Sequence, residues 1–365
     1  MKIFELTSYL ESLAPLSLQE SYDNCGLLIG AAQTEISQVL VTLDCTEEVV
    51  NEAAALGCNL IISHHPIIFG GLKKLNGKNY IERTVILAIQ KNIAIYAIHT
   101  NLDNIKLGVN HKIAERLGLN QTHILDAKPG KLQKLVTFVP ESHFELVQNA
   151  LFEAGAGQIG NYSECAFSLL GEGSFKANLE ANPFIGKVGE RHLEKERRLE
   201  LILPNHLSAA VVFALKKAHP YEEAAYDLYQ LLNANQEIGS GLVGNLPKEM
   251  AETEFLAFLK DKMELDLIRY TPFNRKKINK VAVCGGAGSF LLKQAISAGA
   301  DAFVSADFKY HEFFDAENAI LIADIGHYES EKFTKSLLSE LIIEKFPTFA
   351  VLLSKIVTNP INYYS

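Results

Sequence analysis

Short apolar runs alternate with helical stretches near the start of the sequence. The run VLVTLD (39–44) precedes the helical stretch EEVVNEAAALG (47–57), and a second run, NLIISHHP (59–66), follows it. Apolar runs of this length bounded by polar residues indicate buried strands, and parallel strands need a crossover connection such as a helix. The pattern therefore predicts a βαβ unit in this part of the chain.

The same order returns near the other end of the sequence. A run at 280–288, a helical stretch at 289–299 and a second run at 301–311 align with the first unit, so that Val39 matches Val281 and Ser63 matches Ser305. Each copy is followed by one more apolar run, NIAIYAIH in the first and AILIAD in the second. We expect an α/β fold in which two related α/β halves form one metal-binding domain.

The region between 132 and 232 follows a different pattern. Its expected elements are a strand, a helix, a strand with a turn, a strand, a helix and a strand, in the segments KLVTFVP, SHFELVQNALFEAG, ECAFSLLGEGSF, RRLELILP, NHLSAAVVFALKKA and EEAAYDLYQL. This βαββαβ order is that of a ferredoxin-like unit. We therefore expect a first half at 1–127, a ferredoxin-like inserted domain at 128–245 and a second half at 246–365.

Composition narrows the class of protein. The chain has 365 residues, 48% of them hydrophobic, and a net charge of −9. Its apolar segments fall short of the roughly 20 residues that span a bilayer, so we expect no membrane segment. Five scattered cysteines without CxxC spacing favour a reducing cytoplasm. The acidic balance disfavours nucleic acid as a partner.

Polar residues with metal-binding chemistry follow the predicted strands. His64 and His65 are adjacent at a strand end before Pro66. Neighbouring strand residues point to opposite faces, so only a strand end can turn both imidazoles toward nearby points, an arrangement that suits two ions. Two histidines in a loop are the alternative interpretation.

Asp103 follows the next strand of the same half, in HTNLD, and would add an oxygen ligand. It could equally cap a helix. His99, at the strand terminus, is expected to support the site or the fold rather than to bind a metal.

The segment DIGHYESE in the second half is more specific. If a helix begins near Gly326, His327 and Glu331 lie four residues apart on one face, where an imidazole and a carboxylate can reach one ion. An ordinary pair on a helix surface is the alternative. Together the two halves offer five ligands, with Glu331 as the natural bridge between two ions. Nitrogen and oxygen ligands without thiolate favour zinc, iron, manganese or cobalt.

Two further segments are open to two interpretations. CGGAGS (284–289) turns from a strand into a helix, and its backbone amides could bind a phosphate or simply form a tight turn. Asp23 and Asn24, before a predicted strand, could face a site or form a local turn through their side chains.

The segments SYDNCGLLIG, ISHHP, HTNLD, GGAGS and DIGHYESE, in this order, resemble the signature of the GTP cyclohydrolase 1 type 2 family, also called NIF-three-like. The resemblance covers the whole chain and includes the longer bacterial members with an inserted domain. One departure is Tyr22, where many members have tryptophan.

The resemblance implies roles for individual residues. His64 and Asp103 would bind one ion, His65 and His327 the other, and Glu331 both. It also implies a toroidal homohexamer whose metal sites face an internal cavity, and an insert similar to small trimeric signalling and metal-tolerance proteins.

Three hypotheses of function follow. The first is a metal-dependent hydrolase of a nucleotide or pterin-like substrate, with GTP as the first candidate. A dinuclear site can activate water and polarise a purine ring, and it could equally hydrolyse phosphoesters or amides. The second is a non-enzymatic metal-handling or regulatory ring. The third, a ring that threads nucleic acid, conflicts with the acidic charge.

Overall fold

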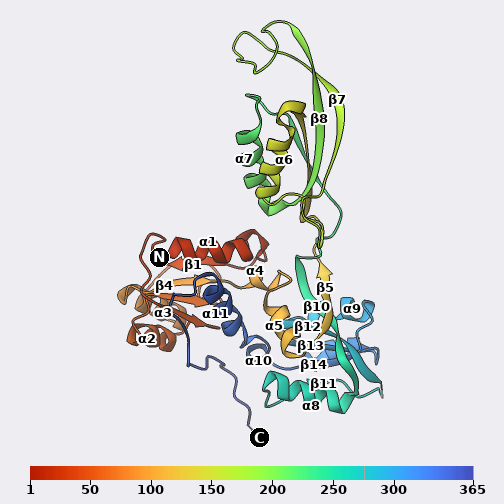
Figure 1. Cartoon of the computed structure of the whole chain (residues 1–365). Coiled ribbons are helices and arrows are strands. Elements are labelled where there is room, and N and C mark those ends of the chain that lie inside the picture. The colour runs from red at the N-terminus through yellow and green to blue at the C-terminus, as the bar shows by residue number, and fades with distance from the viewer. Residues whose placement is uncertain (275, 365) are drawn as a thin grey trace. The chain divides into compact units, whose positions relative to one another are not determined.

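The computed structural model describes residues 1–274 and 276–364. The chain divides into two compact units, unit 1 with residues 1–126 and 237–365 and unit 2 with residues 127–236. The expected α/β class is confirmed, because both units combine sheets with helices (Figure 1). The boundary expected between 245 and 246 falls inside strand β10 (Gly239–Ala251), which joins a sheet of unit 1. None of the helices in the described part of the chain has the length and apolar character of a membrane span.

The first sheet of unit 1 has the strand order β1-β4-β3-β2-β15. Its strands are β1 (Gly26–Ile29), β2 (Val39–Thr42), β3 (Leu60–Ser63), β4 (Ala94–Ala97) and β15 (Val351–Leu353). All pair in parallel except β1, which is antiparallel to β4 at one edge. The predicted strands of the first half are therefore confirmed as neighbours.

Helices cover both faces of this sheet. Alternate strand residues such as Leu40 and Ile61 pack with α2 (Glu47–Ala55) and α3 (Tyr80–Gln90) on one face. On the other face the Tyr96 hydroxyl donates to Glu11 at 3.4 Å. Glu11 belongs to α1 (Ile3–Leu13), and α1 contacts α11 (Thr334–Lys345) through a hydrogen bond from Tyr9 to the Leu341 carbonyl oxygen.

The second sheet has the order β11-β14-β13-β12-β10-β5. Besides β10 its strands are β5 (Asn120–Ala127), β11 (Arg269–Tyr270), β12 (Lys277–Ala287), β13 (Ala302–Ala306) and β14 (Leu321–Asp324). One face packs on 3₁₀ turns at Ser289–Leu291 and Tyr310–Ala316 and on α9 (Leu292–Ser297). The helices that contact β10 or β12 include α5 (Val109–Arg116), α8 (Glu252–Met263) and α10 (His327–Glu331).

The repeat detected in the sequence is present in the strand pairing. Val39 of β2 lies opposite Leu60 of β3, and the aligned Val281 of β12 lies opposite Ala302 of β13. The pairing with the next strand is also equivalent. Ser63 lies opposite Ala97 of β4, and the matched Ser305 lies opposite Asp324 of β14. The crossover helices differ, since the second copy begins as a 3₁₀ turn and α9 is shorter than the helix expected over 289–299.

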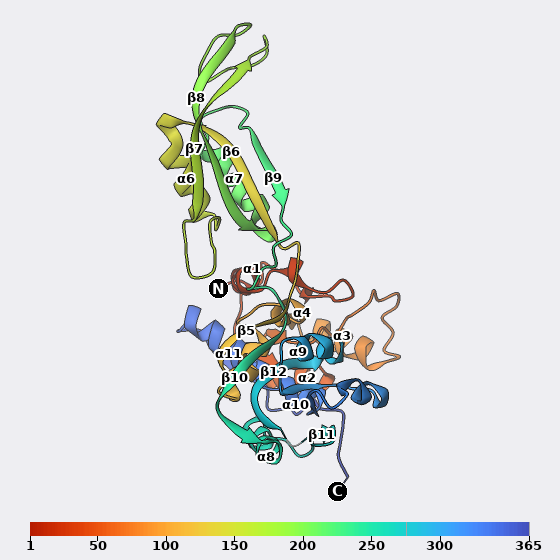
Figure 2. The ribbon, with the colours of Figure 1, turned by 90° about the vertical axis from the view of Figure 1, so that its right-hand side faces the viewer.

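Unit 2 has the chain order β6-α6-β7-β8-α7-β9 and the sheet order β7-β8-β6-β9, with antiparallel neighbours. Its elements are β6 (Leu132–Pro140), α6 (Phe144–Glu153), β7 (Ala166–Lys176), β8 (Arg191–Pro204), α7 (Ser208–Ala218) and β9 (Tyr226–Gln230). Both helices lie on the same face of the sheet (Figure 2).

The turn expected within ECAFSLLGEGSF is not formed. Strand β7 continues to Lys176, which pairs with Arg191 of β8. Gly173 lies inside the ladder, where a Cβ atom would stand 2.2 Å from a carboxylate oxygen of Glu196. This glycine therefore makes room for a cross-strand side chain. The turn prediction was wrong because a glycine within a strand can also mark a close approach of this kind.

Candidate metal centre

The five residues singled out in the sequence lie together in unit 1. His64 and His65 follow β3, Asp103 ends the short helix α4 (Thr100–Asp103) after β4, and His327 and Glu331 are the first and last residues of α10. The helix expected to begin near Gly326 is thus present, with Gly326 as its N-cap. Strand ends and helix termini of both sheets bring these side chains to one place.

Glu331 lies at the centre of the cluster and is 2% exposed. Its Oε2 atom is 3.0 Å from His65 Nε2 and 3.1 Å from His327 Nε2. Its Oε1 atom is 3.9 Å from His64 Nε2. Two groups of converging donor atoms therefore share this carboxylate, one with His64 and Asp103 and one with His65 and His327. A shared carboxylate between two ions is the usual construction of a dinuclear site.

The three histidines are oriented in the same way. Each Nδ1 atom has a hydrogen-bond acceptor, so each neutral imidazole presents its Nε2 lone pair to the cluster. The three contacts are His64 to the Ile98 carbonyl oxygen at 2.8 Å, His65 to Asp44 at 2.7 Å and His327 to Asp307 at 2.7 Å. Imidazoles held in this way are preorganised as metal ligands.

Two buried polar atoms support a cation at this place. Within residues 1–274 and 276–364, His64 Nε2 and Asp103 Oδ1 find no hydrogen-bond partner, although both are buried. They lie 3.6 Å apart. Two ligand atoms at about 2.1 Å from one ion, at a tetrahedral angle, are about 3.4 Å apart. The donor set and its spacing therefore fit a divalent metal ion.

Without a cation, protons compensate the charge of the cluster. Burial lowers the pKa of His65, but hydrogen bonds with Asp44 and Glu331 outweigh it and raise that pKa to about 10. Burial also lowers the pKa of His327, but hydrogen bonds with Asp307 and Glu331 outweigh it and raise that pKa to about 11. Burial favours the neutral form of Glu331, yet the surrounding histidines hold its pKa well below the usual range.

Asp103 behaves in the opposite way. Burial raises its pKa to about 7, and the nearby Glu331 carboxylate acts in the same direction. A carboxylate that is costly to ionise next to another carboxylate is stabilised by a cation between them.

His99 lies in the same cluster. Its ring centroid is 5.2 Å from that of His64 and 5.1 Å from that of His65. Its Nδ1 atom contacts Asp23 Oδ1 at 2.9 Å, and a third group of converging donors consists of these three histidines. His99 is expected from the sequence to support the site or the fold, and the structure gives it the same anchored orientation as the other imidazoles.

Asp44 and Asp307 were missed by sequence reasoning. Each follows a strand end, in VTLD and in SAD, where an aspartate more often makes a turn or a helix cap. The repeat offered a signal, because Asp307 aligns with His65 when Ser305 is matched to Ser63. Both carboxylates orient a histidine of the cluster.

The turn at 285–288 packs against Glu331. Gly286 has φ +62°, and a Cβ atom there would stand 2.5 Å from Glu331 Oε1. The amides of Gly285 and Gly286 donate to Asn110 Oδ1 and Ser330 Oγ, each at 2.9 Å. This supports the tight-turn interpretation, because two of the amides that could have bound a phosphate already have protein acceptors.

Asp23 forms a local turn and also supports the cluster. Its Oδ1 atom accepts hydrogen bonds from the Asn24 amide and from His99, and its Oδ2 atom accepts from the Thr100 hydroxyl. These contacts hold its pKa below the ordinary value against the effect of burial.

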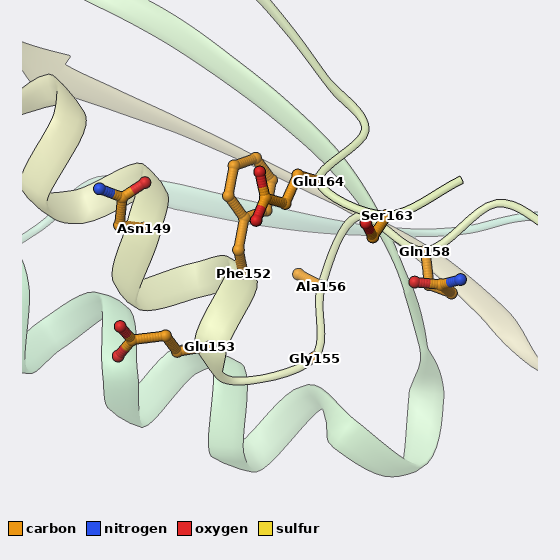
Figure 3. Close-up of a pocket in the computed structure, with 8 residues that line it drawn as sticks. All are labelled: Asn149, Phe152, Glu153, Gly155, Ala156, Gln158, Ser163 and Glu164. Atoms are coloured by element: carbon orange, nitrogen blue, oxygen red, sulfur yellow. The ribbon is translucent and has the colours of Figure 1, made fainter. Parts of the chain in front are cut away.

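Two cavities are lined by residues other than those of the cluster. A cavity of about 330 Å³ in unit 2 is bordered by α6 and the following turn, and Figure 3 shows Asn149 and Glu153 on one side of the Phe152 ring and Gln158 on the other. A cavity of about 580 Å³ in unit 1 is lined by Arg269 and several aromatic side chains, namely Tyr270, Tyr310, Phe313 and Phe314. Neither includes a histidine or a cysteine.

Comparison with known proteins identifies the family. The family model Duf34/NIF3 (NGG1p interacting factor 3) matches residues 1–360. A protein of Bacillus subtilis named GTP cyclohydrolase 1 type 2 homolog is 40% identical, with 98% of each chain covered. A relative of the same name from Halalkalibacterium halodurans is also 40% identical, over 97% of this chain and 96% of its own.

A solved structure agrees with this result. The crystal structure of a Bacillus cereus protein related to NIF3 is 38% identical, with a TM-score of 0.87, and covers 100% of this chain and 99% of its own. The chain therefore belongs to the DUF34/NIF3 family.

Proposed function

We propose that this chain is a cytoplasmic, dinuclear metal-dependent hydrolase that opens the ring of a purine nucleotide, with GTP as the first substrate to test. The proposal rests chiefly on one observation, the buried Glu331 carboxylate shared by two groups of histidine and carboxylate donors. The names of the relatives point to the same reaction class. The metal ligands of the proposal are His64, His65, Asp103, His327 and Glu331, and the ions are zinc, iron, manganese or cobalt.

Each part of the chain has a task in this proposal. When bound, a pair of divalent cations supplies Lewis acidity and lowers the pKa of water. Asp44, Asp307 and the Ile98 carbonyl oxygen hold the imidazoles so that their Nε2 lone pairs face the cluster. Glu331 is kept anionic at neutral pH and can neutralise part of the positive charge.

The test is GTP turnover by purified protein of known metal content, followed as formate release and pterin fluorescence. Wild type is compared with Glu331→Ala and with Glu340→Ala, which removes an exposed carboxylate paired with Lys112. The proposal predicts metal-dependent turnover that is lost in Glu331→Ala and retained in Glu340→Ala. Wild-type protein that holds two ions and releases no formate from GTP would contradict the cyclohydrolase assignment.

A second candidate is a metal-handling or regulatory ring without catalysis. It is favoured by the turn at Gly285 and Gly286, whose two amides donate to protein acceptors and therefore do not bind a phosphate. This candidate predicts ready exchange of the ions and no hydrolysis of nucleotides. Both candidates include the homohexamer that the family resemblance implies, which light scattering on the purified protein would test.

A further inference from the structure

The segment after β15, residues 354–364, runs from the first sheet to the metal centre, and we call it the strap. It begins at Ser354, whose amide donates to the Val41 carbonyl oxygen at 2.9 Å and whose hydroxyl donates to Glu52 at 2.5 Å. The Lys355 amide also donates to Glu52, at 2.8 Å. These bonds fix the start of the strap to β2 and α2.

Thr358 connects the strap to one histidine of the cluster. Its hydroxyl donates to Asp44 Oδ2 at 2.5 Å, while the other oxygen of Asp44 contacts His65 Nδ1 at 2.7 Å. His65 Nε2 in turn faces Glu331. The hydroxyl therefore fixes the carboxylate that fixes the imidazole, in a continuous chain of hydrogen bonds.

Asn359 connects the strap to the other half of the unit. Its amide nitrogen donates to Glu329 Oε1 at 3.0 Å, and Glu329 lies between His327 and Glu331 in α10. The Glu329 carboxylate lies over Gly326, where a Cβ atom would be 2.2 Å from Oε2 and 3.2 Å from the Tyr363 hydroxyl oxygen. Gly326, at φ +89°, thus admits the strap's contacts at the start of α10.

Thr358 and Asn359, which are consecutive in the strap, therefore bond to segments that follow strands of the two different sheets. His65 follows a strand of the first sheet, whereas His327 and Glu331 follow a strand of the second. Ligand atoms must keep their spacing within a few tenths of an ångström to bind an ion tightly. A segment bonded to both sides restricts their relative movement.

We propose that Thr358 and Asn359 are positioning residues of the metal centre, Thr358 for His65 and Asn359 for α10. This inference rests on the metal ligation put forward above. Thr358 acts first on one group of donors, because its chain of bonds enters the cluster through His65. Asn359 acts on both groups, because α10 carries the shared Glu331.

The experiment measures cobalt release from the loaded full-length protein after mixing with excess chelator, followed by the absorbance of bound Co²⁺. Two ions give two kinetic phases in wild type, and His327→Ala identifies the phase that belongs to the His65 and His327 ion. We expect Thr358→Val to accelerate that phase about 10-fold or more and to leave the other unchanged. Asn359→Ala should accelerate both phases, and Thr358→Ser, which keeps the hydroxyl, should release cobalt like wild type.

The control Thr34→Val changes an exposed threonine away from these contacts and should have no effect. Wild-type phases retained in both Thr358→Val and Asn359→Ala would overturn the positioning role while leaving the metal centre intact. A wild-type protein that takes up no cobalt would overturn both. If Thr358→Val does not fold, Asn359→Ala alone decides, because unchanged release from that variant contradicts the proposal.

Discussion

At the residue scale, the cluster depends on acceptors that hold the Nδ1 side of each histidine. Asp44 and Asp307 are both partly exposed, yet each has a lowered pKa. In Asp307 the hydrogen bond with His327 is the main cause, whereas in Asp44 the bond with His65 overcomes the opposing effect of burial. A charged acceptor makes the opposite imidazole nitrogen a better electron donor.

The first prediction concerns these acceptors. Asp44→Asn and Asp307→Asn should each weaken zinc binding by about 10-fold to 100-fold, because the acceptor charge is lost while the ligands remain. Competition against a chelating indicator measures the affinity. The control Asp266→Asn changes an exposed carboxylate and should bind zinc as wild type does. Wild-type affinity in both test variants would show that the two carboxylates do not tune the site.

The second prediction concerns pH. In the metal-free fold the pKa of His65 is raised to about 10 and that of His327 to about 11, whereas an unfolded histidine titrates near 6.5. Their stabilising effect is complete below about pH 6.5 and is lost as the pH rises through the folded values. The metal-free protein should therefore lose about 1.4 kcal/mol of unfolding free energy per pH unit for each histidine between about pH 7.5 and 9.5.

Urea unfolding in the presence of a chelator measures this slope. The variant His327→Gln should show a shallower slope than wild type because one titrating group is gone. Over the same range zinc affinity should rise with pH, since the ion displaces protons from both imidazoles. A wild-type stability that stays level over this range would contradict the raised pKa values.

At the scale of elements, the strand ends and α10 could be predicted because their signals are local. The apolar runs fixed β2, β3, β12 and β13, and the four-residue spacing of His327 and Glu331 indicated α10. The roles of Gly173 and Gly286 could not be predicted, because each depends on a side chain distant in sequence, Glu196 or Glu331. A sequence does not distinguish a glycine that makes room for a neighbouring side chain from a glycine that forms a turn.

The third prediction tests the glycine that borders the cluster. Gly286 and Gly299 both have positive φ, +62° and +70°, but only at Gly286 would a Cβ atom meet Glu331. Gly299→Ala should lose about 1 kcal/mol of unfolding free energy through backbone strain. Gly286→Ala should lose more than that, because its Cβ atom also meets the buried Glu331 carboxylate. Only Gly286→Ala should also lose zinc affinity, which calorimetric titration measures. Equal zinc affinity in both variants would show that the turn does not position Glu331.

At the scale of the whole molecule, the internal repeat could be predicted and the limits of the insert only in part. Equivalent pairing of Val39 and Val281 follows from the aligned runs. The turn-rich composition before β10 extends to Gly241, which lies within that strand, so composition alone does not mark where β10 begins. Sheet pairing, which is not visible in composition, assigns β10 to unit 1.

The fourth prediction separates the two units. All the proposed ligands lie in unit 1, and β5 and β10, which lead to and from unit 2, are neighbours in one sheet. Replacing residues 127–236 with a short glycine-serine linker should therefore leave a folded protein with the zinc content of wild type. Circular dichroism and metal analysis provide the readouts. A folded but metal-free product would show that unit 2 contributes to the centre.

The proposed function requires two ions that share Glu331, so the decisive measurement is the number of zinc ions bound per chain. Demetallated wild type and Glu331→Ala are saturated with zinc, separated from free metal by gel filtration and analysed by mass spectrometry, with circular dichroism to verify the fold. The dinuclear proposal predicts two ions per chain in wild type and less than one in the variant. A folded wild type that retains no zinc, or a variant that retains two ions, would contradict it.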